Sequence, residues 1–185
     1  MRLDYIVKEF GDEVAVTWRS FLLRPAPAVR SLDKFRAYTE SWRIPAGQQD
    51  AGRFRVWSTD EPAPSHSIPP QVAVKAAARQ GAFDLYHLAV MDAYFWENRN
   101  VTAVATLIDV ARRTGLDIPR FEADLRDPDI EQEVIREYDE ALELGITAVP
   151  TVVVDDEWQI PGAQDVLFYR RMIERRRALV AGESS

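Results

Sequence analysis

The chain has 185 residues, a formal net charge of −7 and no cysteine. Its length suits one domain with an inserted subdomain, and 46% hydrophobic with 29% charged residues argues against disorder. The acidic charge disfavours nucleic acid and anionic membranes as partners, and the lack of cysteine excludes disulfide and thiolate chemistry within these residues. No apolar run reaches the roughly 20 residues that cross a bilayer, and no signal peptide is found, so a cytoplasmic location is expected.

The first part of the chain is predicted to hold a helix, a strand and a second helix. Apolar residues recur at helical spacing over 3–10. Apolar and polar residues then alternate over 14–18, which predicts a half-buried strand that runs on to residue 23. A short helix is predicted over 31–42, with Ser31 as its N-cap. The stretch 44–70 is rich in proline, glycine and serine and is predicted to be an irregular connection.

Helices are predicted to fill the middle of the chain. They span 71–80, 84–98, 101–113 with Asn100 as cap, 119–125, and 127–144 with Asp127 as cap. Two short strands over 151–154 and 158–160 follow, and a helix from 165 to about 180 closes the chain. This order favours an α/β fold in which helices are inserted between strands.

Two motifs near the end of the chain resemble a known family. The stretch Gly145 to Val154 (GITAVPTVVV) is followed by Ile160 to Gln164 (IPGAQ), and both resemble the last part of DsbA-like thioredoxin-fold oxidoreductases. Within the helical region, 76–81, 92–95 and 114–117 resemble the FrnE-type branch and its relative, 2-hydroxychromene-2-carboxylate isomerase.

The resemblance implies a fold and a binding loop. Residues 1–64 and 145–185 would form a thioredoxin-like core, and 65–144 a helical insertion. The Val149–Pro150 bond would be cis, as in the family. Val149, Pro150 and Thr151 would present their backbone to the substrate, which would pair with it as an added strand.

One part of the family pattern has no counterpart here. In the family, a first strand delivers a Cys-x-x-Cys motif to the start of the first helix, where the helix dipole stabilises a thiolate. Here Met1 already lies in the first predicted helix, and both strand and motif are absent from the sequence. Two hypotheses remain open: Met1 is an internal methionine of a longer protein, or the chain is a degenerate paralogue that kept the binding groove.

The resemblance implies a thiol-disulfide oxidoreductase, but we expect no redox activity from these 185 residues and assign no catalytic residue, metal ligand or cofactor. One alternative is a glutathione-dependent isomerase or transferase of the kappa-like type. Another is a non-catalytic module that binds peptides. The expected partner is a protein or small-molecule thiol or disulfide, glutathione included, and a homodimer is left open.

Other polar and aromatic residues are assigned structural roles. His66 and His87 have no partner at metal-ligand spacing and are expected on the surface or in the core. The acidic residues of the helix over 127–144 are expected to form a solvated face; they are Glu131, Glu133, Glu137, Asp139, Glu140 and Glu143. Trp42 and Trp57 are expected to be core or lid residues, with a groove lining as the alternative.

Overall fold

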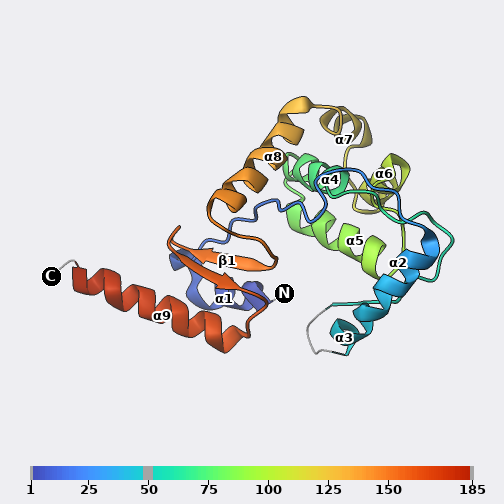
Figure 1. The fold of residues 1–185 in the computed structure, drawn as a ribbon. Helices are drawn as coiled ribbons and strands as arrows, with labels where there is room; N and C mark the ends of the chain where they lie inside the picture. The colour runs from blue at the N-terminus through green and yellow to red at the C-terminus, as the bar shows by residue number, and fades with distance from the viewer. Residues whose placement is uncertain (1, 48–51, 184–185) are drawn as a thin grey trace. The chain divides into compact units, whose positions relative to one another are not determined.

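The computed structural model describes residues 2–47 and 52–183, and the chain divides into two compact units (Figure 1). Met1–Trp18 and Ile146–Ser185 make up the first, which we call the hairpin unit. Arg19–Gly145 makes up the second, which we call the helical unit. Each unit has its own core of buried apolar side chains. None of the described helices is both long enough and apolar enough to cross a membrane.

The hairpin unit is built on two antiparallel strands. β1 (Thr151–Val154) pairs with β2 (Trp158–Pro161) in a register that sets Val152 opposite Ile160. Asp155 and Asp156 both have a positive φ in the turn between the strands, a conformation that aspartate tolerates better than most residues. The predicted strands 151–154 and 158–160 are therefore present.

Two helices complete the hairpin unit. α1 (Arg2–Phe10) and α9 (Val166–Glu183) pack against each other and lie beside the hairpin in Figure 1. Ile6 of α1, Ile160 of β2 and Tyr169 of α9 are the most deeply buried side chains of this core. The apolar side chains predicted for one face of the first helix thus pack against the sheet. A 3₁₀ turn, η1 (Gly11–Glu13), follows directly after α1.

The strand predicted over 14–18 and on to residue 23 is wrong. The segment leaves η1 with extended backbone at Val14, but no strand pairs with it in the part of the chain that is described. Its side chains still alternate, because Val14, Val16 and Trp18 are half-buried and Ala15 is exposed. The alternation of apolar and polar residues therefore predicts which side chains are half-buried. It does not predict a hydrogen-bonded ladder, because a ladder needs a neighbouring strand.

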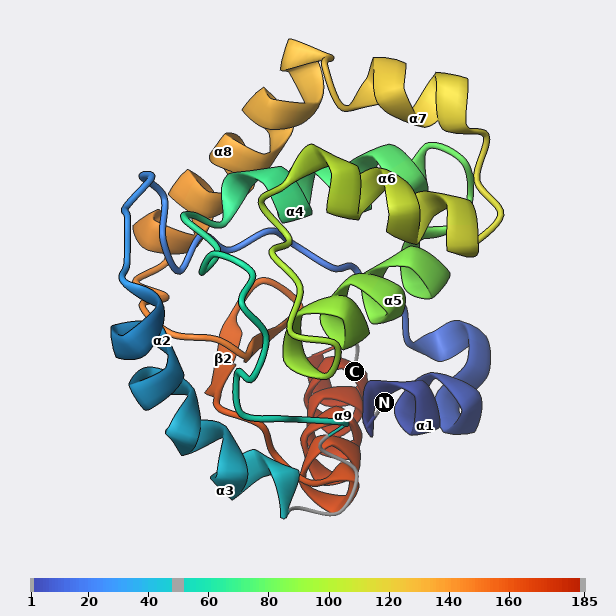
Figure 2. The same cartoon turned by 90° about the vertical axis from the view of Figure 1, so that its right-hand side faces the viewer.

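The helical unit contains seven described α-helices and one 3₁₀ turn (Figure 2). They are α2 (Leu32–Thr39), η2 (Glu40–Trp42), α3 (Arg43–Ala46), α4 (Ile68–Ala78), α5 (Phe83–Phe95), α6 (Val104–Arg113), α7 (Ile118–Asp124) and α8 (Pro128–Glu143). Each helix predicted in this part of the chain is present, with bounds that shift by up to three residues except where 31–42 continues through η2 and α3.

α4 lies at the centre of this unit, since it contacts α5, α6, α7 and α8. Its side chains Ala73, Ala76 and Ala77 are fully buried, and such small residues let neighbouring helices approach closely. Large side chains from the surrounding helices fill the remaining space, among them Tyr86 of α5 and Leu107 of α6. The alanine-rich composition of this helix is therefore a packing feature.

Two of the three predicted helix N-caps are confirmed. The Ser31 hydroxyl accepts a hydrogen bond from the Lys34 N–H (3.4 Å), and the Asp127 carboxylate accepts one from the Asp129 N–H (3.0 Å). Asn100 is not the cap of α6, which begins at Val104. Its side-chain oxygen instead accepts the N–H of Thr102 (3.0 Å) in the turn before that helix.

A second cluster of buried side chains in the helical unit packs against the connection predicted to be irregular, residues 44–70. Phe35, Trp42 and Trp57 are buried together, with the Phe35 and Trp57 ring centroids 4.9 Å apart. The two tryptophans are core residues, as predicted. Asn98 is also fully buried, where its side-chain oxygen accepts the Ser58 N–H (2.9 Å). These contacts hold residues 52–67 against the helices without regular secondary structure.

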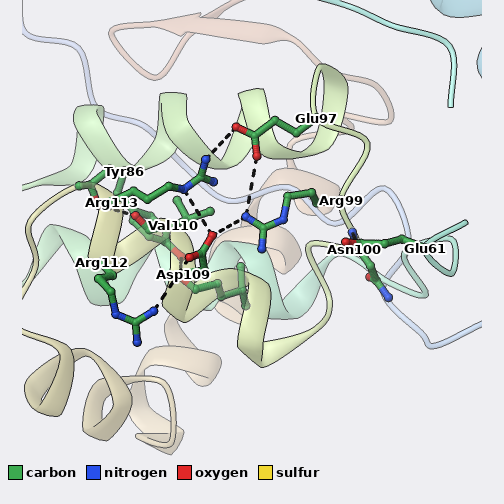
Figure 3. A network of polar contacts seen from close by, with 11 residues as sticks. Glu61, Tyr86, Glu97, Arg99, Asn100, Asp109, Val110, Arg112 and Arg113 are labelled. Carbon is green, nitrogen blue, oxygen red and sulfur yellow. Dashed lines mark hydrogen bonds and ion pairs between the residues drawn. The ribbon is translucent and has the colours of Figure 1, made fainter. Parts of the chain in front are cut away.

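A surface network joins the end of α5 to α6 (Figure 3). Asp109 accepts a hydrogen bond from Arg99 (2.6 Å) and lies 3.4 Å from Arg113, which also pairs with Glu97 (2.8 Å). The Tyr86 hydroxyl of α5 is buried and donates to the Leu107 carbonyl oxygen of α6 (3.0 Å). The side chains of this network are partly exposed, with 23% to 43% of their surface in solvent, so we assign the network a modest role in stability.

The two units differ in their bounds from the predicted division. Residues 19–64 pack with the helical unit, and only residues up to Trp18 and from Ile146 onwards form the hairpin unit. The assignment of 1–64 and 145–185 to a thioredoxin-like core, with 65–144 as an insertion, stays a prediction about which segments correspond to the family core.

Candidate binding loop and family

The predicted site residues lie in and beside an exposed loop of the hairpin unit. Residues 147–150 of this loop are exposed, and the Val149 side chain keeps 43% of its surface in solvent. The Val149–Pro150 peptide bond is cis. Thr151 follows as the first residue of β1 and is half-buried. The loop thus leads directly into the sheet.

Two hydrogen bonds hold the loop to its surroundings. The Gly162 N–H donates to the Pro150 carbonyl oxygen (2.8 Å), which continues the β1–β2 pairing by one step. The Thr151 hydroxyl donates to the Ala148 carbonyl oxygen (2.8 Å) and closes the loop on itself. The two motifs, GITAVPTVVV and IPGAQ, are therefore in direct contact. Gly162 has a φ of +77°, in the left-handed region that glycine occupies without strain.

Residues after Gly162 fix the second motif. The Gln164 side chain donates to the Pro161 carbonyl oxygen (2.9 Å), and the Arg2 guanidinium donates to the Gln164 carbonyl oxygen (3.2 Å). Asp165 then accepts the Phe168 N–H (2.7 Å) and caps the first turn of α9. The side of the loop that faces β2 is thus held by the unit's own hydrogen bonds.

The other side of the loop is open. Within the described ranges, no hydrogen-bond partner is found for the backbone N–H or C=O of Val149, and β1 is paired with β2 only. Free backbone groups beside a strand can accept an extended segment by adding a strand to the sheet. Residues 146–151 carry no titratable side chain, so the loop itself offers no acid–base group.

Comparison with known proteins identifies the family. The model of the DSBA-like thioredoxin domain matches residues 1–174. The chain belongs to the DSBA-like thioredoxin domain family. Its fold is the thioredoxin-like α/β fold of DsbA relatives with a helical insertion, as the resemblance implied, and the family acts in thiol-disulfide exchange.

Individual relatives agree with the family. The chain is 28% identical over 160 residues to the uncharacterized protein YwbO of Bacillus subtilis, covering 83% of this chain and 78% of that protein. A probable DsbA oxidoreductase from Streptomyces coelicolor superposes with a TM-score of 0.71 at 24% identity, covering 94% and 81% of the two chains. The cytosolic disulfide reductase DsbM from Pseudomonas aeruginosa, solved with GSH, gives 0.66 at 19% identity, covering 98% and 90%.

The two histidines of this DSBA-like chain lie apart from the loop in the sequence and have local contacts. His66 shares a hydrogen bond of 2.8 Å between its Nδ1 and the Ser65 hydroxyl. His87 stacks on Phe83 with ring centroids 5.6 Å apart, and burial lowers the pKa of its imidazole against the opposing effect of Asp84. No group of three or more metal-ligating side chains is found among the residues that the structure describes.

One acidic residue of α8 was assigned wrongly. Glu137 was expected on a solvated face, but only 5% of its surface is exposed. It accepts hydrogen bonds from the Ser20 N–H (2.6 Å) and from Lys75 Nζ (2.6 Å). Burial alone would raise the pKa of Glu137, but the bonds from Lys75 and Ser20 outweigh it and hold that pKa below the ordinary value of 4.5. The residue ties the segment at Ser20 to α4 and α8.

The sequence contains a pattern that predicts the burial of Glu137. It lies three residues after Val134 and seven after Ile130, and both of these side chains are fully buried. It therefore continues the apolar stripe of α8 and not its acidic face. A single acidic residue in an apolar stripe indicates a buried charge, which needs a cationic or hydrogen-bonding partner.

Proposed function

We propose that this DSBA-like chain binds an extended peptide or a small thiol compound at the loop of Val149, Pro150 and Thr151, and that these 185 residues do so without redox chemistry of their own. The observation that carries the proposal is the open backbone of Val149 at the edge of β1. Binding by backbone pairing uses no particular side chain, so it suits partners of varied sequence.

The redox part of the proposal follows from chemistry. Thiol-disulfide exchange begins with attack of a thiolate on a disulfide sulfur, and this sequence contains no cysteine. The chain as given should therefore not reduce insulin in the presence of a thiol reductant above the rate of the reductant alone. Robust turnover in that assay would overturn the proposal.

Binding is tested by NMR with a peptide whose cysteine is S-methylated, so that recognition is separated from exchange. We expect the amide signals of Val149 and Thr151 to shift on titration, together with those of β1. Shifts that are absent from this loop, or that are confined to the helical unit, would contradict the proposal.

Two variants at one position separate backbone from side-chain recognition. Val149→Pro removes the backbone N–H that would pair with the peptide, and Val149→Ala keeps it while shortening the exposed side chain. We expect the first to weaken binding at least about tenfold and the second to change it little. Circular dichroism of both variants checks that the fold is retained. Equal effects would mean that the Val149 side chain, and not its backbone, is recognised.

A glutathione-dependent isomerase or transferase is the second candidate. Its support is the similarity of fold to DsbM, which was solved with GSH and is described as cytosolic. That similarity also supports the cytoplasmic location expected from the sequence. Titration with S-methylglutathione in the same NMR experiment separates the candidates: shifts at Val149 and Thr151 with this tripeptide and none with the longer peptide would favour the glutathione-using function.

A further inference from the structure

Two arginines of the helical unit lie on a segment that is firmly held. The Arg24 N–H donates to the Ser67 hydroxyl (3.1 Å), and the Ser67 N–H donates to the Arg24 carbonyl oxygen (2.8 Å). Four residues on, the Ala28 N–H donates to the Ser65 carbonyl oxygen (3.2 Å). Arg30 lies two residues before the start of α2. The backbone that carries both arginines is therefore fixed at more than one point.

Both guanidinium groups lie against one tyrosine of α2. The Arg24 Cζ is 5.8 Å and the Arg30 Cζ 5.6 Å from the ring centroid of Tyr38. Arg24 also donates to the Pro64 carbonyl oxygen (3.4 Å). Within residues 2–47 and 52–183, neither arginine forms an ion pair with a carboxylate. Two like charges are thus held near one aromatic ring, and no carboxylate of the described residues lies within 4.0 Å of either guanidinium group.

Most arginines of this unit are arranged differently. Arg36 lies 2.8 Å from Asp60, Arg79 lies 2.6 Å from Asp127, and several others have an acidic partner on a neighbouring turn or helix. In a chain with a net charge of −7, acidic side chains are plentiful. The pair at Tyr38 is therefore a local concentration of positive charge on an acidic protein.

A second tyrosine, Tyr94 of α5, packs against the aromatic cluster of Phe35, Trp42 and Trp57. The Tyr94 ring packs on Trp42 with centroids 5.1 Å apart, and burial raises the pKa of Tyr94 to about 12 while Arg24 and Arg30 act in the opposite direction. Phe35 links the two tyrosines, because its ring lies 6.0 Å from that of Tyr38 and Tyr94 packs against the cluster to which Phe35 belongs. In the described part of the chain, no hydrogen bond is found for the hydroxyl of Tyr94 or of Tyr38. Tyr38 is 51% exposed, so the group opens to solvent.

We propose that Arg24, Arg30, Tyr38 and Tyr94 form a binding site for a small oxyanion, either a carboxylate or a phosphate. Guanidinium and phenol groups both donate hydrogen bonds, and charge-assisted bonds to carboxylate or phosphate oxygens are the strongest that guanidinium makes. The anion would supply the acceptor that the protein lacks at this point. All four residues belong to the helical unit, so the site is independent of the proposal for the loop at Val149.

The chemistry favours a small ligand over a polyanion. The overall charge of −7 repels an extended polyanion, whereas a single carboxylate or phosphate meets only the local field of the two arginines. Because the group is partly exposed, its affinity depends on ionic strength and should be moderate. The ligand is the anionic end of a metabolite or of a peptide-like compound.

Calorimetric titration of the full chain with phosphate, and separately with succinate, tests the site. Sodium chloride at matched ionic strength controls for screening. We expect at least one oxyanion to bind with a dissociation constant below about 10 mM. Preference for phosphate or for succinate decides which oxyanion is the better ligand. Binding of neither below that concentration would overturn the proposal.

Variants test the assignment of residues. Arg30→Gln should weaken binding at least about tenfold, because it removes one charge and contacts little else. Tyr94→Phe should weaken it by a smaller factor, since only a neutral hydroxyl is lost. Arg136→Gln is the matched control: it removes an exposed arginine of the same unit and should leave binding unchanged. Equal loss in Arg30→Gln and Arg136→Gln would reduce the effect to overall charge and refute the site.

Discussion

Replacing Glu137 with alanine should lower the free energy of unfolding of the helical unit by about 3 kcal/mol. The change removes a buried acceptor from the Ser20 N–H and from Lys75, each of which lies 2.6 Å away. Ser20 is itself 3% exposed, so its N–H would be left buried without a partner. The loss therefore combines an unpaired charge with an unsatisfied donor.

The size of the expected loss follows from the contacts that Lys75 keeps in the variant. Breaking a buried ion pair costs about 3–5 kcal/mol when one charge stays behind. Here Lys75 keeps Glu133 at 2.9 Å, a partner whose side chain is 42% exposed, so the loss should fall at the low end of that range. Glu137→Gln keeps an acceptor for Ser20 and loses only the charge, so about 1 kcal/mol is expected.

Urea unfolding followed by far-UV circular dichroism measures these losses. Glu140→Gln is the control, because Glu140 lies on the same helix with 60% exposure and should change the free energy of unfolding by less than about 0.5 kcal/mol. The double variant Lys75→Met with Glu137→Leu should recover the part of the loss that comes from the unpaired Lys75 charge, while the part that comes from the Ser20 N–H remains. A loss below about 1 kcal/mol for Glu137→Ala would refute the reasoning.

The stabilisation from Glu137 should depend on pH. The pKa of Glu137 is lowered in the folded state, so its contribution is complete above the unfolded value near 4.5 and is lost as the pH falls through the folded value. The pKa of Lys75 is raised despite its burial, because Glu137 and Glu133 accept its hydrogen bonds, so its contribution is lost only as the pH rises above 10.5. The difference between wild type and Glu137→Gln should therefore shrink in acid.

Three further outcomes are expected. Tyr86→Phe removes the buried bond to the Leu107 carbonyl oxygen and should cost about 1 kcal/mol in urea unfolding; no change would mean that water replaces the bond. Asp109→Asn weakens the partly exposed network with Arg99, so a loss below about 1 kcal/mol that fades at high salt is expected, whereas a salt-independent loss would contradict a surface role. The imidazole of His87 should titrate below 6.5 by NMR, since burial lowers its pKa; a higher midpoint would show that the ring is solvated.

Local features of this fold follow well from the sequence. Three such features depend on residues within a few positions of one another. They are the cap at Ser31, the proline start of α8 after Asp127 and the hairpin over Thr151–Pro161. The strand over 14–23 fails for a physical reason. Alternation fixes which side chains are half-buried, whereas a ladder also requires a partner that local sequence does not reveal.

The candidate sites divide in the same way. The family resemblance pointed to Val149, Pro150 and Thr151, but the bond between Gly162 and Pro150 joins motifs that are separated along the chain. Arg24 and Tyr94 are further apart still, and nothing in the pattern around either residue indicates the other. Sites formed by distant segments need the fold before their chemistry can be recognised.

The position of α4 has a consequence for how this sequence can change over time. Ala73, Ala76 and Ala77 have no exposed surface, and the helix that carries them touches four others. An added methyl group there displaces several helices at once, whereas a change on an exposed face is absorbed by solvent. We therefore expect relatives that keep this arrangement to retain small residues along α4, while their outer helix faces diverge freely.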